Sequence, residues 1–438
     1  MTVGKQVQYT LMKDLGAPIL SGIDEVRRRF RGRRPPPKNF GPPLAAGKTL
    51  RRIMTRHYLL ARYAKGHLPV AWVTSGAPVE LLRLFGCYTV YPENHGALCG
   101  ARGQGAALCS QAEERGYSQD LCSYARIDLG HLFSDRTPVG RLPRPDLLFC
   151  CTNICQTVLA WYRVLADYLD IPLFLFDTPF VFEGQSEADF RYMAAQLEAM
   201  VPALERVTGR SFDRRALSRV LELSKRTSAL WGDILETMQH RPAPMSIFDA
   251  FAHMAPVVSL RGLPIAEHFY RSLLDELRGR MKAGIGALRE ERRRLLWDNI
   301  AMWYRVAELA RLFAARGCNF VVATYTNAWA ETSGLLEAGE PFLALAKAYS
   351  PVILNNRFAH RLGLMQRLIT DYQVDGLVIH SARSCKPYSI GQYELRHLLV
   401  GTAGIPAVII EADIADERVY AEEQTRTRLE AFFEQLGV

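Results

Sequence analysis

Five cysteines in three separate segments could provide ligands for a metal cluster. Cys150, Cys151 and Cys155 lie where an apolar, strand-like run ends and a helical pattern begins, Cys385 follows another such run, and Cys122 lies in a third segment. Thiolates from three different loops suit an iron–sulfur cubane, whose fourth iron stays open when its last ligand is water or substrate. The three segments therefore offer ligands for one such cluster.

The same cysteines also have a purely structural interpretation. Cysteine is among the most commonly buried residues, so Cys150 and Cys151, on an apolar strand, are more typical of core residues than of ligands. Cys87 and Cys318 are interpreted as structural too. Basic neighbours would help to keep the remaining thiols ionised, and the candidates for this role are Arg126, Arg383 and Lys386.

A hydroxyl group and a carboxyl group form a second candidate site. Ser75 follows a predicted strand at 69–74, and Glu93 follows a predicted strand at 87–91. If these strands are parallel neighbours, both side chains lie at the same edge of the sheet, where they could move protons. Ser75 could instead cap a helix that begins just after it.

The elements that position these residues alternate between short apolar runs and helical patterns. This alternation predicts an α/β fold with two Rossmann-like, parallel-sheet lobes. A helical connection at 187–290 separates a lobe at 53–186 from a lobe at 291–438, and the cleft between the strand ends is where ligands usually bind. The predicted strands are 69–74, 87–91, 146–151, 172–176, 294–297, 319–324, 376–380 and 406–411, and a closing helix is predicted at 422–436.

The charge of the chain is concentrated at its start. Residues 1–52 carry twelve Lys and Arg against three acidic residues, which accounts for the whole net charge of +9 of the 438 residues. The neutral remainder argues against a nucleic-acid-binding surface on the folded body. The arm contains an Arg-rich run at 27–34 and prolines at 35–37, so we expect no continuous helix there. It is interpreted either as an arm that wraps a partner or as a solvated tail.

Other patterns limit the location and the cofactors of the protein. No membrane span is expected, because the longest apolar region, 158–182, is interrupted by four charged residues. Nine cysteines at irregular spacing do not resemble a secreted disulfide framework, so a reducing, cytoplasmic environment is expected. The segment 41–49 (GPPLAAGKT) differs from a P-loop in its glycine spacing and in its two prolines. If ATP is used, we expect a partner to bind it.

Several of these segments together resemble the family of benzoyl-CoA reductases and 2-hydroxyacyl-CoA dehydratases. The similarity spans roughly residues 65–438. Its most specific part is the stretch 411–416 (EADIAD) followed by 422–430 (EEQTRTRLE). The other matching stretches are 75–80 (SGAPVE), 91–94 (YPEN), 122–126 (CSYAR), 152–155 (TNIC) and 380–388 (HSARSCKPY).

The resemblance implies an iron–sulfur subunit of an ATP-driven ketyl-radical enzyme. One [4Fe–4S] cubane would be held by Cys122, Cys155 and Cys385, beside an acyl-CoA thioester, with Cys151 as a less favoured ligand. The implied partners are a homologous sibling subunit with its own cluster and a separate ATP-hydrolysing activator that delivers electrons from ferredoxin.

The resemblance also implies roles for residues beside the cluster. Ser75 and Glu93 match positions that the family's dehydratases use for proton movement, and a protonated Glu93 or His95 would quench a radical anion. An apolar wall for an aryl group is expected from Tyr325, Trp329 and Tyr388.

Within the family, the sequence is interpreted as resembling the larger of the two cluster-binding subunits, the B subunit, of ATP-dependent benzoyl-CoA reductase. The features that favour this assignment are the basic arm, His95, and the pair Cys150 and Cys151. The expected reaction is reduction of the aromatic ring of benzoyl-CoA, or a related aryl-CoA, to a cyclic diene. The alternatives are an (R)-2-hydroxyacyl-CoA dehydratase subunit, a double-cubane reductase, and an electron-relay subunit without its own substrate site.

Overall fold

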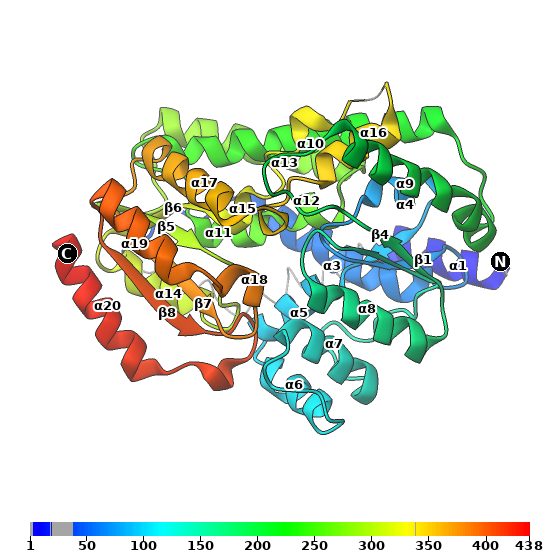
Figure 1. Ribbon diagram of the computed structural model, residues 1–438, viewed down its shortest axis with the longest axis horizontal. Helices are drawn as coiled ribbons and strands as arrows, with labels where there is room; N and C mark the ends of the chain where they lie inside the picture. Colours follow the sequence, from blue (N-terminus) through cyan, green and yellow to red (C-terminus); the bar gives the residue numbers. More distant parts are fainter. Residues whose placement is uncertain (1–2, 18, 20–37, 338) are drawn as a thin grey trace.

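Two parallel β-sheets, each flanked by helices, form the framework of the computed structural model, which describes residues 3–17, 19, 38–337 and 339–438. A layer of long helices runs along one side of both sheets (Figure 1). The predicted fold class, α/β with two Rossmann-like lobes, is confirmed.

The first sheet has the strand order β2-β1-β3-β4. Its strands are β1 (Val70–Val73), β2 (Tyr88–Val90), β3 (Leu147–Cys151) and β4 (Leu173–Phe176). Strands β1 and β3 are buried along their whole length, as expected for parallel strands that are covered by helices on both faces. The chain adds β2 on one side of β1 and β3 on the other, so the carboxyl ends of β1 and β3 flank a crevice.

The second sheet repeats this arrangement with the order β6-β5-β7-β8. Its strands are β5 (Arg293–Asp298), β6 (Cys318–Ala323), β7 (Gly376–Ala382) and β8 (Ala407–Ala412). The corresponding crevice lies at the ends of β5 and β7. Each of the eight strands overlaps the apolar run from which it was predicted.

Helices cover both sheets (Figure 1). Those of the first lobe are α3 (Ala46–Ala64), α4 (Val79–Leu84), α5 (Pro92–Ala101), α6 (Gly105–Glu113), α7 (Ser123–Ser134) and α8 (Gln156–Leu169). Those of the second lobe are α14 (Val306–Ala314), α15 (Thr324–Asn327), α16 (Pro341–Tyr349), α17 (Phe358–Asp371), α18 (Lys386–Ser389), α19 (Gln392–Ala403) and α20 (Glu422–Leu436). No helix in the described ranges is both long and apolar enough to cross a membrane.

A helical segment joins the two sheets. It comprises α9 (Glu187–Thr208), α10 (Arg214–Glu236), α11 (Ile247–His253), α12 (Ala255–Ser259) and α13 (Pro264–Lys282). Ser186 and Asp189 form a capping box at the start of α9, and Asp213 caps α10. Helix α10 contacts both α4 of the first lobe and α16 of the second, so this segment packs against both lobes.

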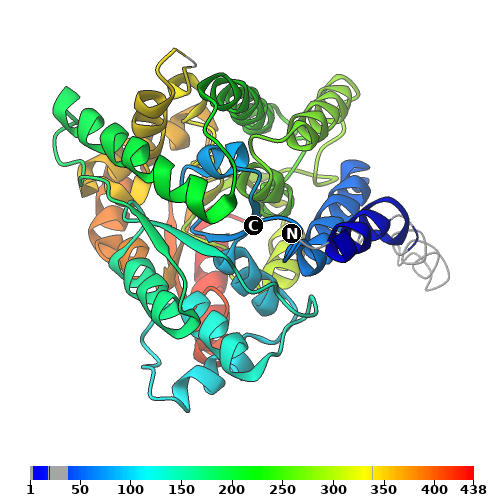
Figure 2. The same cartoon turned by 90° about the vertical axis from the view of Figure 1, so that its right-hand side faces the viewer.

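The start of the chain differs in part from the predicted irregular arm. The run 27–34 and the prolines at 35–37 lie outside the described residues, but α1 (Val3–Leu11) is helical and lies beside α3 (Figure 2). Helix α3 itself begins before residue 53 because its apolar face, including Leu50 and Ile53, is buried in the core. Four apolar residues spaced by four along the first segment stay exposed: Val7, Leu11, Leu15 and Ile19.

The segment 41–49, which the sequence analysis distinguished from a P-loop, has a structural role. The backbone N–H groups of Ala45 and Ala46 donate to the two carboxylate oxygens of Glu276, at 2.7 and 2.9 Å. This carboxylate occupies the amide donors at the start of α3 that a phosphate would otherwise contact.

Candidate active site

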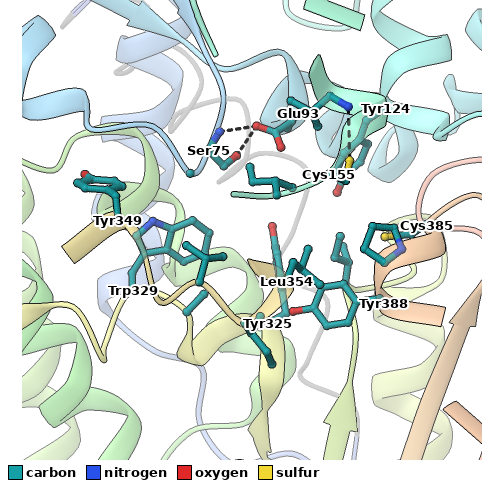
Figure 3. A pocket seen from close by; sticks show the side chains of 18 of the residues that line it. Ser75, Glu93, Tyr124, Cys155, Tyr325, Trp329, Tyr349, Leu354, Cys385 and Tyr388 are labelled. Atoms are coloured by element: carbon teal, nitrogen blue, oxygen red, sulfur yellow. Dashed lines mark hydrogen bonds between the residues drawn. The ribbon is translucent and has the colours of Figure 1, made fainter. Parts of the chain in front are cut away.

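A cavity lies between the two lobes, at the carboxyl ends of their central strands. Its space, with the open mouth and the solvent there included, is about 1090 Å³. Five of the predicted site residues line it: Ser75, Glu93, Cys122, Cys155 and Cys385. Figure 3 shows Ser75, Glu93 and Cys155 on one side of the cavity and Cys385 approaching from the second lobe.

Each of the three cavity cysteines immediately precedes a helix. Cys122 is the N-cap of α7, Cys155 of α8 and Cys385 of α18. The backbone N–H of Val158 donates to Cys155 Sγ at 3.4 Å. Cys122 and Cys385 do not accept such a bond, but the backbone N–H groups of Ala125 and Tyr388, three residues after them, still lower the pKa of the two thiols. Backbone N–H groups at a helix start favour the ionised thiolate, which is the form that binds metal.

The three thiols also influence one another. Burial raises the pKa of Cys122 well above its usual value, and the charges of Cys385 and Cys155 raise it further. Burial, followed by the charge of Cys155, raises the pKa of Cys385 to about 12. A cation bound by the three cysteines would favour their thiolate forms and offset the repulsion between those charges.

The arrangement of these donors fits a cluster better than a single ion. No three His, Cys, Asp or Glu side chains of the described residues converge on one metal ion. A cubane does not need such convergence, because each thiolate binds a different iron. Three cysteines from three loops around one cavity are thus a donor set that such a cluster could use, with one iron left open.

The basic neighbours predicted to ionise the thiols do not have that role. Arg126 is neutralised by buried ion pairs with two carboxylates. Arg383 and Lys386 are exposed, and Lys386 donates to the backbone carbonyl of Arg383. The side chain that lowers the pKa of Cys385 is the buried Arg361, whose effect is smaller than that of burial. Backbone N–H groups that follow each cysteine, rather than these side chains, lower the pKa of the three thiols.

The predicted hydroxyl–carboxyl pair is formed. Ser75 Oγ donates to Glu93 Oε2 at 2.7 Å, and the backbone N–H of Ser75 donates to the same oxygen. The alternative interpretation, in which Ser75 caps a helix, is wrong, because α4 begins at Val79 without a side-chain cap. Burial raises the pKa of Glu93, and the two hydrogen bonds from Ser75 only partly oppose this effect. A carboxyl group of this kind can hold and release a proton within the cavity.

His95 does not belong to this site. Its ring faces His131 edge-on, and its Nε2 contacts Thr137 Oγ1, so it does not line the cavity. Burial lowers the pKa of His95 to about 3, which keeps the imidazole neutral at ordinary pH. The structure therefore separates His95 from Glu93 and removes it from the candidate catalytic groups.

Cys151 is a core residue and not a cluster ligand. It lies at the end of β3, where its thiol donates to Asn153 Oδ1 at 2.7 Å and contacts Thr74 Oγ1 at 3.1 Å. Among the described residues, which include all nine cysteines in their free form, no second group of thiols lines the cavity. The six that are buried elsewhere are Cys87, Cys99, Cys109, Cys150, Cys151 and Cys318. The cavity thus offers three thiols, fewer than the larger ligand set that a double cubane requires.

The wall opposite the Ser75–Glu93 pair is aromatic. Tyr325, Trp329 and Tyr388, which the sequence interpretation placed there, all line the cavity (Figure 3). Tyr349 and Leu354 also line it and were not anticipated. The second lobe therefore provides an apolar surface against which a planar or branched group can pack.

Asn153 is a positioning residue that sequence reasoning missed. Its Nδ2 donates to the carbonyl oxygens of Gly76, at 2.9 Å, and Tyr349, at 2.7 Å, and so links the two lobes beside the cavity. A Cβ atom at Gly76 would lie 2.5 Å from Asn153 Oδ1, so this close approach requires glycine. The only signal in the sequence was its place in the matched stretch 152–155.

Comparisons with known proteins agree with this architecture. The sequence model of "2-hydroxyglutaryl-CoA dehydratase, D-component" matches residues 74–436. The (R)-phenyllactyl-CoA dehydratase alpha subunit of Clostridium sporogenes is 34% identical over 367 residues, which cover 83% of this chain and 89% of that subunit. The (R)-2-hydroxyisocaproyl-CoA dehydratase alpha subunit of Clostridioides difficile is 32% identical, with 87% and 95% covered. The B subunit of benzoyl-CoA reductase from Thauera aromatica is 28% identical, with 84% and 89% covered. The chain therefore belongs to the family of 2-hydroxyacyl-CoA dehydratase and benzoyl-CoA reductase subunits.

Proposed function

We propose that this chain is the cluster-binding, alpha-type subunit of an (R)-2-hydroxyacyl-CoA dehydratase. The observation that carries the proposal is that three cysteines and the Ser75–Glu93 pair line one cavity. One [4Fe–4S] cluster held by Cys122, Cys155 and Cys385 would lie beside the bound thioester. The relatives at 34% and 32% identity, both dehydratase alpha subunits, support dehydration more than the reductase relative at 28% does.

The residues of this chain can perform the proton movements of a dehydration. When bound, the cluster would supply single electrons of low potential to the thioester. Loss of water from a 2-hydroxyacyl group removes a proton from C3 and requires a proton on the hydroxyl group that leaves C2. Glu93, whose pKa is raised by burial, can carry a proton between these two atoms. Ser75 holds the Glu93 carboxyl group in a fixed orientation through its two donated hydrogen bonds.

The proposed enzyme has further components. The relatives are alpha or B subunits, which supports a sibling subunit as partner. An ATP-hydrolysing activator that passes on ferredoxin electrons is proposed as the electron source. The amide donors at the start of α3 are already bound by Glu276, which agrees with ATP binding on another chain.

Ring reduction of benzoyl-CoA is the second candidate. The aromatic cavity wall would accept a benzoyl group, and the relative from Thauera aromatica supports the reaction. Two features that favoured ring reduction lie outside the site, because His95 does not line the cavity and Cys150 and Cys151 are buried in β3. The basic arm lies outside the matched residues 74–436.

The test is anaerobic turnover of the complex reconstituted with its sibling subunit, activator, ATP and reductant. With (R)-phenyllactyl-CoA we expect an enoyl-CoA product that has lost one water. With benzoyl-CoA we expect no cyclic diene. Formation of the diene without any dehydration would favour the second candidate, and a fully loaded complex that converts neither thioester would overturn both.

A further inference from the structure

One member of a buried ion pair, Arg261, forms part of the cavity wall. Arg261, which lines the cavity, donates from Nε to Glu80 Oε1 at 2.9 Å. A second nitrogen of Arg261 donates to the hydroxyl group of Tyr349, and this hydroxyl donates to Glu80 Oε2 at 2.6 Å. The side chains of Glu80 and Arg261 are 0% and 3% exposed. The three side chains thus form a closed, desolvated network.

The partners of Arg261 fix its position from three elements. Glu80 lies in α4, Tyr349 ends α16, and Val257 in α12 accepts a further bond from Arg261 Nη1 at 2.7 Å. The Arg261 guanidinium also lies over the Tyr349 ring, 5.4 Å from its centre. A guanidinium that is held in this way keeps its position when one partner loses only its charge.

The pairing leaves the cavity without an available cation. Among the described residues, Arg261 is the only Lys, Arg or His that lines it. Burial is the largest single effect and would raise the pKa of Glu80, but the charge of Arg261 and the hydrogen bonds to the carboxylate, including the one from Tyr349, together lower this pKa. The pair is therefore ionised on both sides and has no net charge. A carboxylate at the end of a substrate side chain would lose its water here and gain no ionic partner, which is costly.

An uncharged substrate side chain needs no ionic partner and can pack against the apolar part of the same wall. Tyr325, Trp329, Tyr388 and Leu354 face the same space and can pack against an aromatic or branched group. The wall therefore favours an apolar side chain through its contacts and disfavours an acidic one through the neutralised Arg261.

We propose that Glu80 sets the substrate class of this site by neutralising Arg261, so that the enzyme accepts 2-hydroxyacyl-CoA thioesters with apolar side chains, above all aryl ones, and rejects those with an acidic side chain. This inference rests on the proposed function. It assigns to Glu80 a positioning role in specificity, separate from the proton chemistry of Glu93.

The experiment measures binding to the cluster-loaded complex by calorimetry, without turnover. The two probes are (R)-phenyllactyl-CoA and (R)-2-hydroxyglutaryl-CoA, which share the CoA part and differ in the charge of the side chain. We expect the wild type to bind the aryl thioester at least about tenfold more tightly, because the acidic side chain lacks an ionic partner. Equal binding, or tighter binding of the acidic thioester, would overturn the inference.

The variant Glu80→Gln tests whether the charge of Glu80 causes the preference for the aryl thioester. Glutamine keeps an oxygen acceptor and nearly the same volume but removes the charge, so Arg261 becomes an available cation. The preference for the aryl thioester should fall by about tenfold or more, since a charge-assisted bond to the acidic side chain becomes possible. An unchanged preference in a folded Glu80→Gln complex would contradict the proposal.

A double variant controls for altered folding. Glu80→Gln/Arg261→Gln removes both charges and should keep the wild-type preference. If Glu80→Gln does not fold, the inference is tested by comparing the affinities of the double variant and of the wild type for the two thioesters. A double variant that prefers the acidic thioester overturns the inference. A loaded complex that binds and dehydrates both thioesters equally sinks this inference alone, whereas one that dehydrates neither sinks the proposed function.

Discussion

Ser384 Oγ accepts a hydrogen bond of 3.2 Å from the backbone N–H of Ser123, which joins the loops of two candidate cluster ligands. Ser123 follows Cys122 in the first lobe, and Ser384 precedes Cys385 in the second. The same Ser384 hydroxyl donates to Asp413 Oδ2, in the loop after β8. The ligand loops are thus held by neighbours of the cysteines, and such outer contacts orient metal ligands before the metal arrives.

Replacement of any one cavity cysteine should prevent cluster assembly. Cys122→Ser, Cys155→Ser and Cys385→Ser each remove a thiolate from a three-thiolate site, so iron content and the EPR signal of this chain should be lost after anaerobic reconstitution. Cys318→Ser is the matched control, because Cys318 lies in β6 and does not line the cavity. A normal cluster signal in Cys385→Ser would show that the ligand set is wrong.

Glu93→Gln should abolish turnover and leave the cluster intact. Glutamine can still accept the hydrogen bonds from Ser75, but it cannot carry a proton, so the rate should fall by at least about 100-fold. Ser75→Ala removes one of the two donors and should cost less, about tenfold. The rate and the EPR spectrum are measured on the same preparation. If Glu93→Gln retains activity, the substrate-binding site lies on the sibling chain.

A buried carboxyl group behind the cavity should make stability depend on pH. Asp128 Oδ2 accepts a hydrogen bond of 2.9 Å from Nε1 of Trp161, a residue of the cavity wall. Burial raises the pKa of Asp128 to about 7 from its ordinary 3.8. Between these values the native state binds more protons than the unfolded state, so the free energy of unfolding falls as pH rises, by up to about 1.4 kcal/mol per pH unit.

Asp128→Asn tests this dependence, because asparagine keeps an oxygen acceptor for Trp161 and cannot ionise. Urea unfolding of wild type and variant at pH 5 and pH 7 should show a smaller loss of stability in Asp128→Asn. Equal losses in the two proteins would rule out Asp128 as the titrating group.

The carboxylates of the stretch 411–416 should stabilise the contact between the lobes. Asp416 Oδ2 pairs with Arg126 Nη1 of the first lobe at 2.8 Å, and both side chains are 1% exposed. Asp416→Ala leaves a buried arginine with one fewer partner and should cost about 3–5 kcal/mol in the free energy of unfolding. Arg426→Ala breaks an exposed pair on α20 and should change it by about 0.5 kcal/mol or less. Similar costs for the two variants would contradict a structural role for this stretch.

Patterns within single segments predicted most of the fold and of the site. The closing helix α20 spans the predicted 422–436, and the eight strands follow from buried apolar runs. Parallel strands end at one edge of a sheet, which is why Ser75 and Glu93 could be placed together. His95 could not be placed by this reasoning alone. On a helix, the side chains of two residues that are two positions apart, such as Glu93 and His95, point in directions that differ by about 200°.

Contacts between distant segments could not be predicted in the same way. Glu80, Arg261 and Tyr349 meet only because α4, the loop after α12 and α16 converge on the cavity. The hydrogen bond from the backbone N–H of Val158 to Cys155 was missed because it depends on where α8 begins, and no side-chain charge marks it. The expectation of ring reduction rested on the arm, His95 and Cys150 with Cys151, and the described residues among these do not line the cavity.

The most direct test is the EPR spectrum of the reduced complex before and after addition of (R)-phenyllactyl-CoA. We predict about four irons in this chain and a signal that changes when the thioester binds, because cluster and substrate would share one cavity. The component that changes should be absent in the complex with Cys385→Ser. A chain that binds no iron, or a signal that the thioester leaves unchanged, would contradict the proposal that this cavity holds a cluster beside an acyl-CoA.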